Sequence, residues 1–283
     1  MAKPAPAPAP VDPKVALQKK VNTKVIMTNE FKGGLIVGVE NSDQAKVAER
    51  VGARGVVVVG TVNAAFANMT TTADPAVVRD ILGSVLVPVI GRIRLGHIIE
   101  AKVMEACHVD SIDEHEGLTQ AADEGIEKFS SNIPIIAGVQ DLKDSLKAIL
   151  QGASMLRTHF KLKEDKPLIG ETVKVLTKIA DDIEGLNGKT DAELTTYLGS
   201  IKYPLAGLKN IIKTKKFPVP LFAEGGIILP TDVAMVMGLN ADGCIASSLV
   251  FKVPDPKRRI HSMIKAVQYY NNPAKLINYL EDS

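Results

Sequence analysis

Strongly basic and acidic residues stand at the ends of three short apolar runs of the sequence. One run ends in Arg92 and Arg94, a second in Asp113–Glu116 (DEHE), and a third in Arg157–His159 (RTH). Guanidinium, carboxylate and imidazole groups are suited to binding a charged ligand and to moving protons on it. Taken one at a time, each group is equally well explained as a salt bridge or a solvated rim. The prediction of a ligand site therefore rests on the convergence of all three.

Two later segments have the composition of phosphate-binding loops. Glu224 is followed by Gly225 and Gly226, and another apolar run ends in Ser247 and Ser248. Glycine lets backbone N–H groups approach an anion closely, and serine adds a hydroxyl donor. We therefore predict phosphate binding by these two glycines and two serines, with a simple tight turn as the alternative for the glycine pair. The Glu224 carboxylate beside this pocket is expected to repel such a ligand.

The histidines near these runs do not form a metal-binding pattern. His115 and His159 could be imagined as ligands beside Asp113, but their spacing matches no recognised metal motif. A histidine at the start of a loop is often a hydrogen-bonded rim residue. We therefore expect no metal and no cofactor.

The elements that must position these residues follow from an alternation of apolar runs and amphipathic helical stretches. The predicted strands are Gly34–Val39, Gly55–Gly60, Val87–Arg94, Asp110–Glu114, Ile133–Val139, Ser154–His159, Pro220–Ala223 and Gly243–Ser247. Continuous apolar strands separated by helices indicate a parallel sheet covered by helices. Eight such units, with no G-x-G-x-x-G after the first strand, favour a closed α/β barrel, the (β/α)8 TIM barrel. In this fold a ligand lies over the C-terminal ends of the strands, where the polar residues above fall.

Two segments lie outside the regular units. Thr190–Lys216 carries two helical patterns and is predicted to be a short helical insertion between units six and seven. Residues 1–20 are rich in alternating Ala and Pro, which favours an extended, disordered arm, and they lack the apolar stretch of a signal peptide. Residues 21–283 are predicted to form a single barrel domain.

The composition limits the function classes. The 283 residues are 46% hydrophobic, enough for a sizeable core, and carry a net charge of +2. This balance gives no reason to expect a nucleic-acid or membrane partner, and no run approaches the ~20 apolar residues of a membrane helix. Cys107 and Cys244 stand in apolar segments and are expected to be buried and reduced. A cytoplasmic protein is expected.

Five stretches resemble the synthase subunit of pyridoxal 5′-phosphate synthase, the PdxS/Pdx1/SNZ family. They are Lys32–Val39, Pro88–Glu100, Asp113–Asp123, Gly152–Thr158 and Phe222–Phe251, and together they reach across nearly all of the chain after residue 30. The resemblance implies a family activity that makes pyridoxal 5′-phosphate from a pentose phosphate, a triose phosphate and ammonia. It also implies a glutaminase partner that supplies the ammonia, and hexameric rings that stack into dodecamers.

The positions that carry the family's chemistry are changed in this chain. Arg92 and His159 stand where the resemblance implies the two lysines that carry the sugar skeleton, and Gly38 where it implies an aspartate that assists proton transfer. An imine needs a neutral primary amine, which neither a guanidinium nor an imidazole provides. The predicted strands contain no lysine, and the lysines of loop 161–166 are poorly placed for catalysis on a mobile loop.

Other positions of the family pattern are retained. Asp113, Glu114, Glu116 and Arg157 match the family and are interpreted as the scaffold of an old site. The combination predicts a catalytically inactive pseudoenzyme that acts as a regulatory or scaffolding subunit in vitamin B6 biosynthesis. It would form a homo- or hetero-oligomer, hexamer or dodecamer, with active family paralogues. Docking of the glutaminase subunit is doubtful, because residues 11–31 match the family poorly.

Two alternatives stay open. The first is an active pyridoxal 5′-phosphate synthase or a related phosphosugar enzyme with rewired catalytic residues, using Arg92, Asp113, Glu116 and His159. The second is a noncovalent sensor, with a phosphosugar as its possible ligand.

Overall fold

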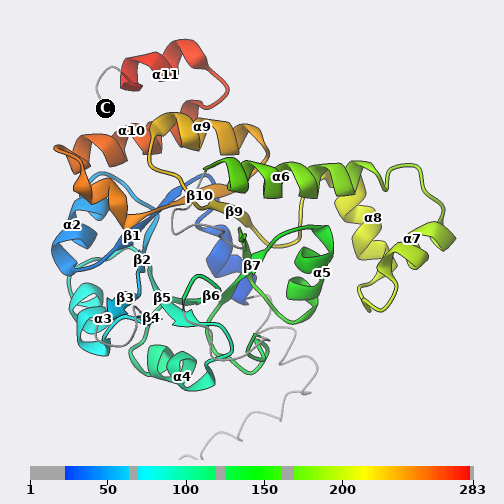
Figure 1. The fold of residues 1–283 in the computed structure, drawn as a ribbon, viewed down its shortest axis with the longest axis horizontal. Coiled ribbons are helices and arrows are strands. Elements are labelled where there is room, and N and C mark those ends of the chain that lie inside the picture. Colours follow the sequence, from blue (N-terminus) through cyan, green and yellow to red (C-terminus); the bar gives the residue numbers. More distant parts are fainter. Residues whose placement is uncertain (1–22, 64–68, 119–124, 161–168, 281–283) are drawn as a thin grey trace, which may run out of the picture.

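Eight parallel strands close into a barrel (Figure 1). The structure is a computed structural model that describes residues 23–63, 69–118, 125–160 and 169–280. The barrel strands are β1 (Leu35–Val39), β2 (Gly55–Val58), β5 (Val89–Arg94), β6 (Ser111–His115), β7 (Ile135–Val139), β8 (Met155–Thr158), β9 (Leu221–Glu224) and β10 (Gly243–Ala246). Their order around the ring is β1-β10-β9-β8-β7-β6-β5-β2. The predicted barrel is confirmed, and the strand ends lie within one or two residues of those expected.

Helices surround this barrel and shield its outer face from water (Figure 1). They are α2 (Ser42–Arg50), α3 (Pro75–Leu82), α4 (Ile98–Ala106), α5 (Leu142–Leu150), α6 (Ile169–Glu184), α9 (Pro230–Gly238) and α10 (Pro256–Tyr269). Side-chain caps fix where several of them begin. The Asn41 side chain accepts a hydrogen bond from the N–H of Gln44, and Asp141 does the same for Asp144, which satisfies N–H groups that a helix start leaves unpaired. Between β6 and β7, the described residues 125–134 contain no helix.

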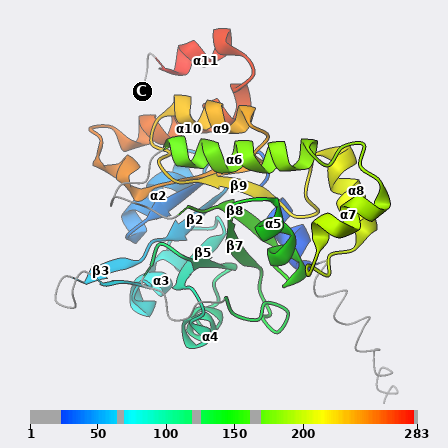
Figure 2. The ribbon, with the colours of Figure 1, turned by 45° about the vertical axis from the view of Figure 1, so that its right-hand side comes forward.

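The predicted insertion between units six and seven is present as two short helices. They are α7 (Asp191–Leu198) and α8 (Leu205–Thr214), and they pack beside the end of α6 (Figure 2). A capping box between Thr190 and Glu193 starts the first of them.

The structure contains a small hairpin and a last helix that were not predicted from the sequence. The antiparallel pair β3 (Thr61–Asn63) and β4 (Met69–Thr71) follows β2, and α11 (Pro273–Leu280) packs on α10. Strands of three residues are too short to carry a periodic signal. The predicted arm, residues 1–20, lies outside the described residues, so the extent of the barrel domain stays a prediction.

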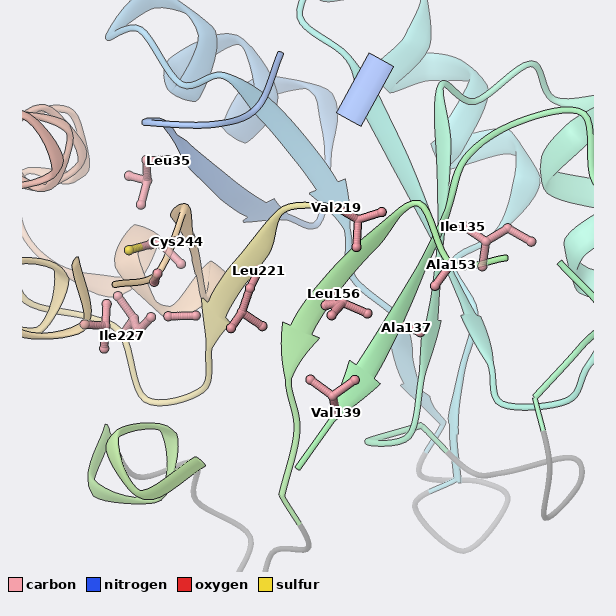
Figure 3. Packing of buried hydrophobic residues seen from close by; sticks show 14 of the residues in the cluster. Leu35, Ile135, Ala137, Val139, Ala153, Leu156, Val219, Leu221, Ile227 and Cys244 are labelled. Carbon is pink, nitrogen blue, oxygen red and sulfur yellow. The ribbon is translucent and has the colours of Figure 1, made fainter. Parts of the chain in front are cut away.

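Two apolar layers hold the barrel together. The outer layer lies between strands and helices and includes Leu35, Val139, Leu156, Leu221 and Cys244, all of which Figure 3 shows. The inner layer fills the barrel near the N-terminal ends of its strands and consists of Phe31, Ile36, Val57, Ile90, Ile136, Met155, Phe222 and Ile245. Successive residues of a strand face opposite sides, so every barrel strand except β6 contributes to both layers, and β6 contributes Ile112 to the outer layer alone. Burial on both faces explains why the strands read as continuous apolar runs.

Two further expectations concern cysteines and membranes. Cys107 and Cys244 are buried and unpaired, as predicted. Within the described part of the chain, no helix has both the length and the apolar character that crossing a bilayer requires.

Candidate functional site

A charged layer lies directly above the apolar filling of the barrel. Two residues beyond the inner apolar layer, the inward positions of β1, β5, β8 and β9 are Gly38, Arg92, Arg157 and Glu224. These four residues line a cavity of about 240 Å³ at the C-terminal ends of the strands. The predicted convergence of strand ends on one site is therefore seen in the structure.

Asp113 joins the two arginines at the floor of this cavity. Its Oδ2 accepts a hydrogen bond from Arg92 Nε at 2.8 Å, and its Oδ1 accepts one from Arg157 Nε at 2.7 Å. Asp113 is fully buried, and Arg157 is 1% exposed. Buried ions persist only when paired and hydrogen-bonded. This floor is therefore a fixed structural unit, with both guanidiniums held in one orientation.

Glu224 lies across the same two arginines. Arg92 Nη2 donates to Glu224 Oε1 at 2.6 Å, and Arg157 Nε lies 3.2 Å from Glu224 Oε2. Burial alone would raise the pKa of Glu224, but the guanidiniums of Arg92 and Arg157 outweigh it and hold that pKa well below 4.5. The carboxylate is therefore charged at neutral pH. The sequence predicted Glu224 only as a repelling charge and missed this pairing.

A third carboxylate, Glu116, also contacts Arg157. Arg157 Nη2 donates to Glu116 Oε2 at 2.6 Å, and His159 Nδ1 lies 3.7 Å from the same oxygen. Gly138 makes room for this contact, because a Cβ there would come within 2.4 Å of Glu116 Oε2. Burial would raise the pKa of Glu116, but Arg157 and then His159 lower it to about 2.

Two histidines complete the cavity wall. His115 Nε2 lies 3.6 Å from Glu224 Oε2, and His159 faces Glu116. Burial, then Arg157 and Arg92, lowers the pKa of His115 below 6.5, and burial also lowers the pKa of His159. Both imidazoles are therefore neutral at pH 7. Among the described side chains of this network, the two guanidiniums and the three carboxylates sum to a formal charge of −1.

Gly38 lies close to the backbone of the neighbouring strand β10 and of Ser248 just after it. A Cβ at Gly38 would lie 3.0 Å from the backbone N of Ser248 and 3.1 Å from the carbonyl oxygen of Ala246. Both neighbours are main-chain atoms, which cannot swing aside as a side chain does. A Cβ at this position would therefore require the neighbouring backbone to shift by a few tenths of an ångström.

The predicted phosphate loops border the cavity, but they are partly covered. Gly225 and Gly226 have positive φ angles of 111° and 69°, a backbone form that glycine adopts without strain. The ring of Phe160 lies against Gly225, since a Cβ there would come within 2.6 Å of it. Ser247 lines the cavity, while the Ser248 hydroxyl is turned to Glu40 and donates to its Oε1 at 2.9 Å. Phosphate binding by these four residues stays a prediction.

Two charged residues at the strand ends face away from the cavity. Arg94 Nε donates to Glu100 at 2.7 Å, and Glu114 pairs with the buried amine of Lys128 at 3.0 Å. These are the structural salt bridges that the sequence left open as an alternative. The lysines of loop 161–166 lie outside the described residues, and the described residues that line the cavity include no lysine.

Asp113, His115 and Glu224 each bring one potential ligand atom within 4.8 Å of the others. Carboxylate and imidazole are ordinary metal ligands. Both carboxylates, however, already pair with Arg92 and Arg157, and a cation placed there would be repelled by the two guanidiniums. The donor set therefore fits an ion-pair network better than a metal centre, and the expectation of no metal stays a prediction.

Fold and site together define a (β/α)8 barrel whose mouth carries a buried ion-pair network beside two glycine- and serine-containing loops. The family model described as the SOR/SNZ family matches residues 20–224, and this chain belongs to that family. The chain is 37% identical over 256 residues to "Pyridoxal 5'-phosphate synthase subunit PdxS" of Thermotoga maritima, covering 89% of this chain and 87% of that protein. It is 34% identical over 257 residues to subunit SNZ1 of Saccharomyces cerevisiae, covering 89% and 86%.

One solved structure with the same fold is a thiamine phosphate pyrophosphorylase from Pyrococcus furiosus. The TM-score is 0.52 at 15% sequence identity, over 86% of this chain and 98% of that chain. At this identity the similarity concerns the barrel fold alone.

Proposed function

We propose that this chain is a noncatalytic member of its family that acts as a regulatory or scaffolding subunit in vitamin B6 biosynthesis. The observation that carries the proposal is the state of Arg92, which stands where the family resemblance implies an imine-forming lysine. Its guanidinium is paired with Asp113 and Glu224. A guanidinium stays protonated and offers no amine electron pair to a carbonyl carbon.

The other two changed positions support the same conclusion. His159, at the second lysine position, faces Glu116 and has no primary amine. Gly38 has no side chain with which to move a proton, and a Cβ there would lie 3.0–3.1 Å from the backbone of Ser248 and Ala246. The side chains that the family resemblance implies at positions 38, 92 and 159 are thus absent, while the barrel itself is intact.

The catalytic half of the proposal is tested with the purified chain. Ribose 5-phosphate, glyceraldehyde 3-phosphate and ammonium chloride are supplied, and pyridoxal 5′-phosphate is followed by its absorbance. The PdxS subunit of Thermotoga maritima serves as the positive control. We expect no product above the protein-free background. Product at a rate comparable with the control contradicts the proposal.

The assembly half is tested on the complex isolated from the chain's own source. The relatives are named as subunits, and we propose that this chain likewise joins homo- or hetero-oligomers, hexamers or dodecamers, with active paralogues. Native mass spectrometry gives the mass of the complex and the identity of each subunit. We expect an active paralogue in the same particle. A homo-oligomeric particle that contains this chain alone agrees with the proposed oligomer but contradicts the regulatory role.

A rewired phosphosugar enzyme is the second candidate. It is favoured by two neutral histidines that each face a carboxylate, His159 with Glu116 and His115 with Glu224, an arrangement suited to general acid–base catalysis. The test is to incubate the chain with ribose 5-phosphate in D2O and follow carbon-bound deuterium by NMR. Exchange that His159→Gln abolishes favours this candidate, and absence of exchange counts against it.

A further inference from the structure

The contacts of the Glu224 carboxylate resemble those of a bound anionic ligand more than those of a structural residue. Its Oε1 accepts a hydrogen bond from Arg92 Nη2, while its Oε2 is buried, lies near Arg157 Nε and His115 Nε2, and accepts no hydrogen bond of good geometry. Arg157 Nε is already directed at Asp113. The carboxylate thus sits between two guanidiniums that it satisfies only in part.

The main chain fixes this position of Glu224. Thr158 Oγ1 donates to the carbonyl oxygen of Glu224 at 2.7 Å and accepts from its N–H at 2.8 Å. Thr172 Oγ1 on α6 lies 2.8 Å from the same carbonyl oxygen and 2.8 Å from that of Gly225, and its single proton can be donated to either. Hydrogen bonds from β8 and from α6 thus fix the backbone of Glu224. In this position its side chain projects over Arg92 and Arg157.

The charges give the consequence of this placement. With Glu224 present, the described ion-pair network holds one negative charge in excess, and the Glu224 carboxylate would repel a phosphate ester in a region of low dielectric constant. Without it, Arg92 and Arg157 are balanced by Asp113 and Glu116. The two guanidiniums would then face an open space next to the backbone of Gly225. Arginine binds phosphate oxygens well because of its planar, multiple N–H donors.

We infer that the Glu224 carboxylate is an internal counter-ion that occupies a latent phosphate-binding site formed by Arg92 and Arg157. The ligand class of this site is the phosphomonoester group of a small molecule, and Glu224 keeps that group out of the native protein. The inference deepens the proposed function, on which it rests, because it gives a physical reason for weak phosphosugar binding at the same site.

Isothermal titration calorimetry tests this inference with two probes, inorganic phosphate and ribose 5-phosphate. The proteins are the full chain, Glu224→Ala and Glu224→Gln, with Glu184→Gln as the matched control. Glu184 is exposed on α6, and its change removes the same charge far from the mouth. We expect Glu224→Ala to bind ribose 5-phosphate at least tenfold more tightly than the native chain. We expect Glu184→Gln to bind as the native chain does.

The double variant Arg92→Ala/Glu224→Ala identifies where the ligand binds. If the phosphate group bound by Glu224→Ala contacts the arginine pair, this double variant should lose most of the gained affinity. Circular dichroism and thermal melting confirm that each variant is folded, and Glu224→Gln keeps the side-chain volume should Glu224→Ala prove unstable.

Two results overturn the inference: folded Glu224 variants that bind phosphate no more tightly than the native chain, or a gain in affinity that survives loss of Arg92. Neither result bears on whether the mouth offers an amine for imine formation. Failure of the inference is therefore distinct from failure of the proposed function, which only formation of pyridoxal 5′-phosphate or the absence of a paralogue would indicate.

Discussion

Arg157 and Asp113 form the most deeply buried ion pair of the barrel mouth, with Arg157 Nε 2.7 Å from Asp113 Oδ1 and both side chains 1% exposed. Arg157 lies on β8 and Asp113 on β6, so the pair spans the strand between them. Burial would lower the pKa of Arg157, but Asp113, Glu116 and Glu224 outweigh it and raise that pKa. Arg157 also contacts Glu116 and Glu224, so it links three carboxylates at the barrel mouth.

Replacing Arg157 by leucine should lower the free energy of unfolding more than most single substitutions do. Loss of the guanidinium leaves Asp113 and Glu116 buried without their shared cation, which typically costs about 3–5 kcal/mol. Urea denaturation measures the free energy of unfolding. The control is Lys178→Ala, which removes a largely exposed partner of Asp141 and should cost at most about 1 kcal/mol. Equal effects of the two changes would contradict the structural role of Arg157.

Acid should destabilise the protein through Glu116. Its pKa is about 2 in the folded state against an ordinary value of 4.5, so its contribution is fully present above pH 4.5 and is lost as the pH falls towards 2. Since one pKa unit corresponds to about 1.4 kcal/mol, this contribution is roughly 3 kcal/mol. Unfolding free energies measured from pH 6 to pH 2 should fall less steeply for Glu116→Gln. An unchanged slope would show that Glu116 keeps an ordinary pKa.

Restoring an aspartate at position 38 should destabilise the chain and fail to restore the family's activity. A Cβ meets backbone atoms of Ala246 and Ser248 at 3.0–3.1 Å, and overpacking of this kind costs about 1–3 kcal/mol. Gly38→Ala isolates the cost of the Cβ, and Gly38→Asp adds a fourth carboxylate to the mouth. Thermal melting should rank native above Gly38→Ala and Gly38→Ala above Gly38→Asp. A Gly38→Asp protein as stable as the native chain would show that the backbone yields readily.

Arg92→Lys alone should form little imine with ribose 5-phosphate at pH 7.5. The new ammonium would lie between Asp113 and Glu224, and both charges favour its protonated form. Arg92→Lys/Glu224→Ala removes one of them, and a shift of one pKa unit gives about tenfold more neutral amine. Borohydride reduction followed by intact-mass analysis should show about tenfold faster adduct formation in the double variant. Equal rates would mean that Glu224 does not control the charge at position 92.

Much of this protein was predictable from local sequence. Continuous runs such as GVVV at Gly55–Val58 bury both faces and therefore indicate a parallel sheet. The sequence alone also gives the residues at positions 38, 92 and 159, so the absence of a primary amine at these positions is known without the structure. The three-residue strands β3 and β4 were missed because so short a segment has no period.

The pairing of Glu224 with Arg92 was decided by the tertiary structure alone. The two residues are 132 positions apart, and only closure of the barrel and the register of its strands bring their side chains within 2.6 Å. The same holds for Phe160 against Gly225 and for the backbone that encloses Gly38. Sequence spacing fixes which face of a strand a residue occupies, but the partner across the barrel depends on how all eight strands are staggered.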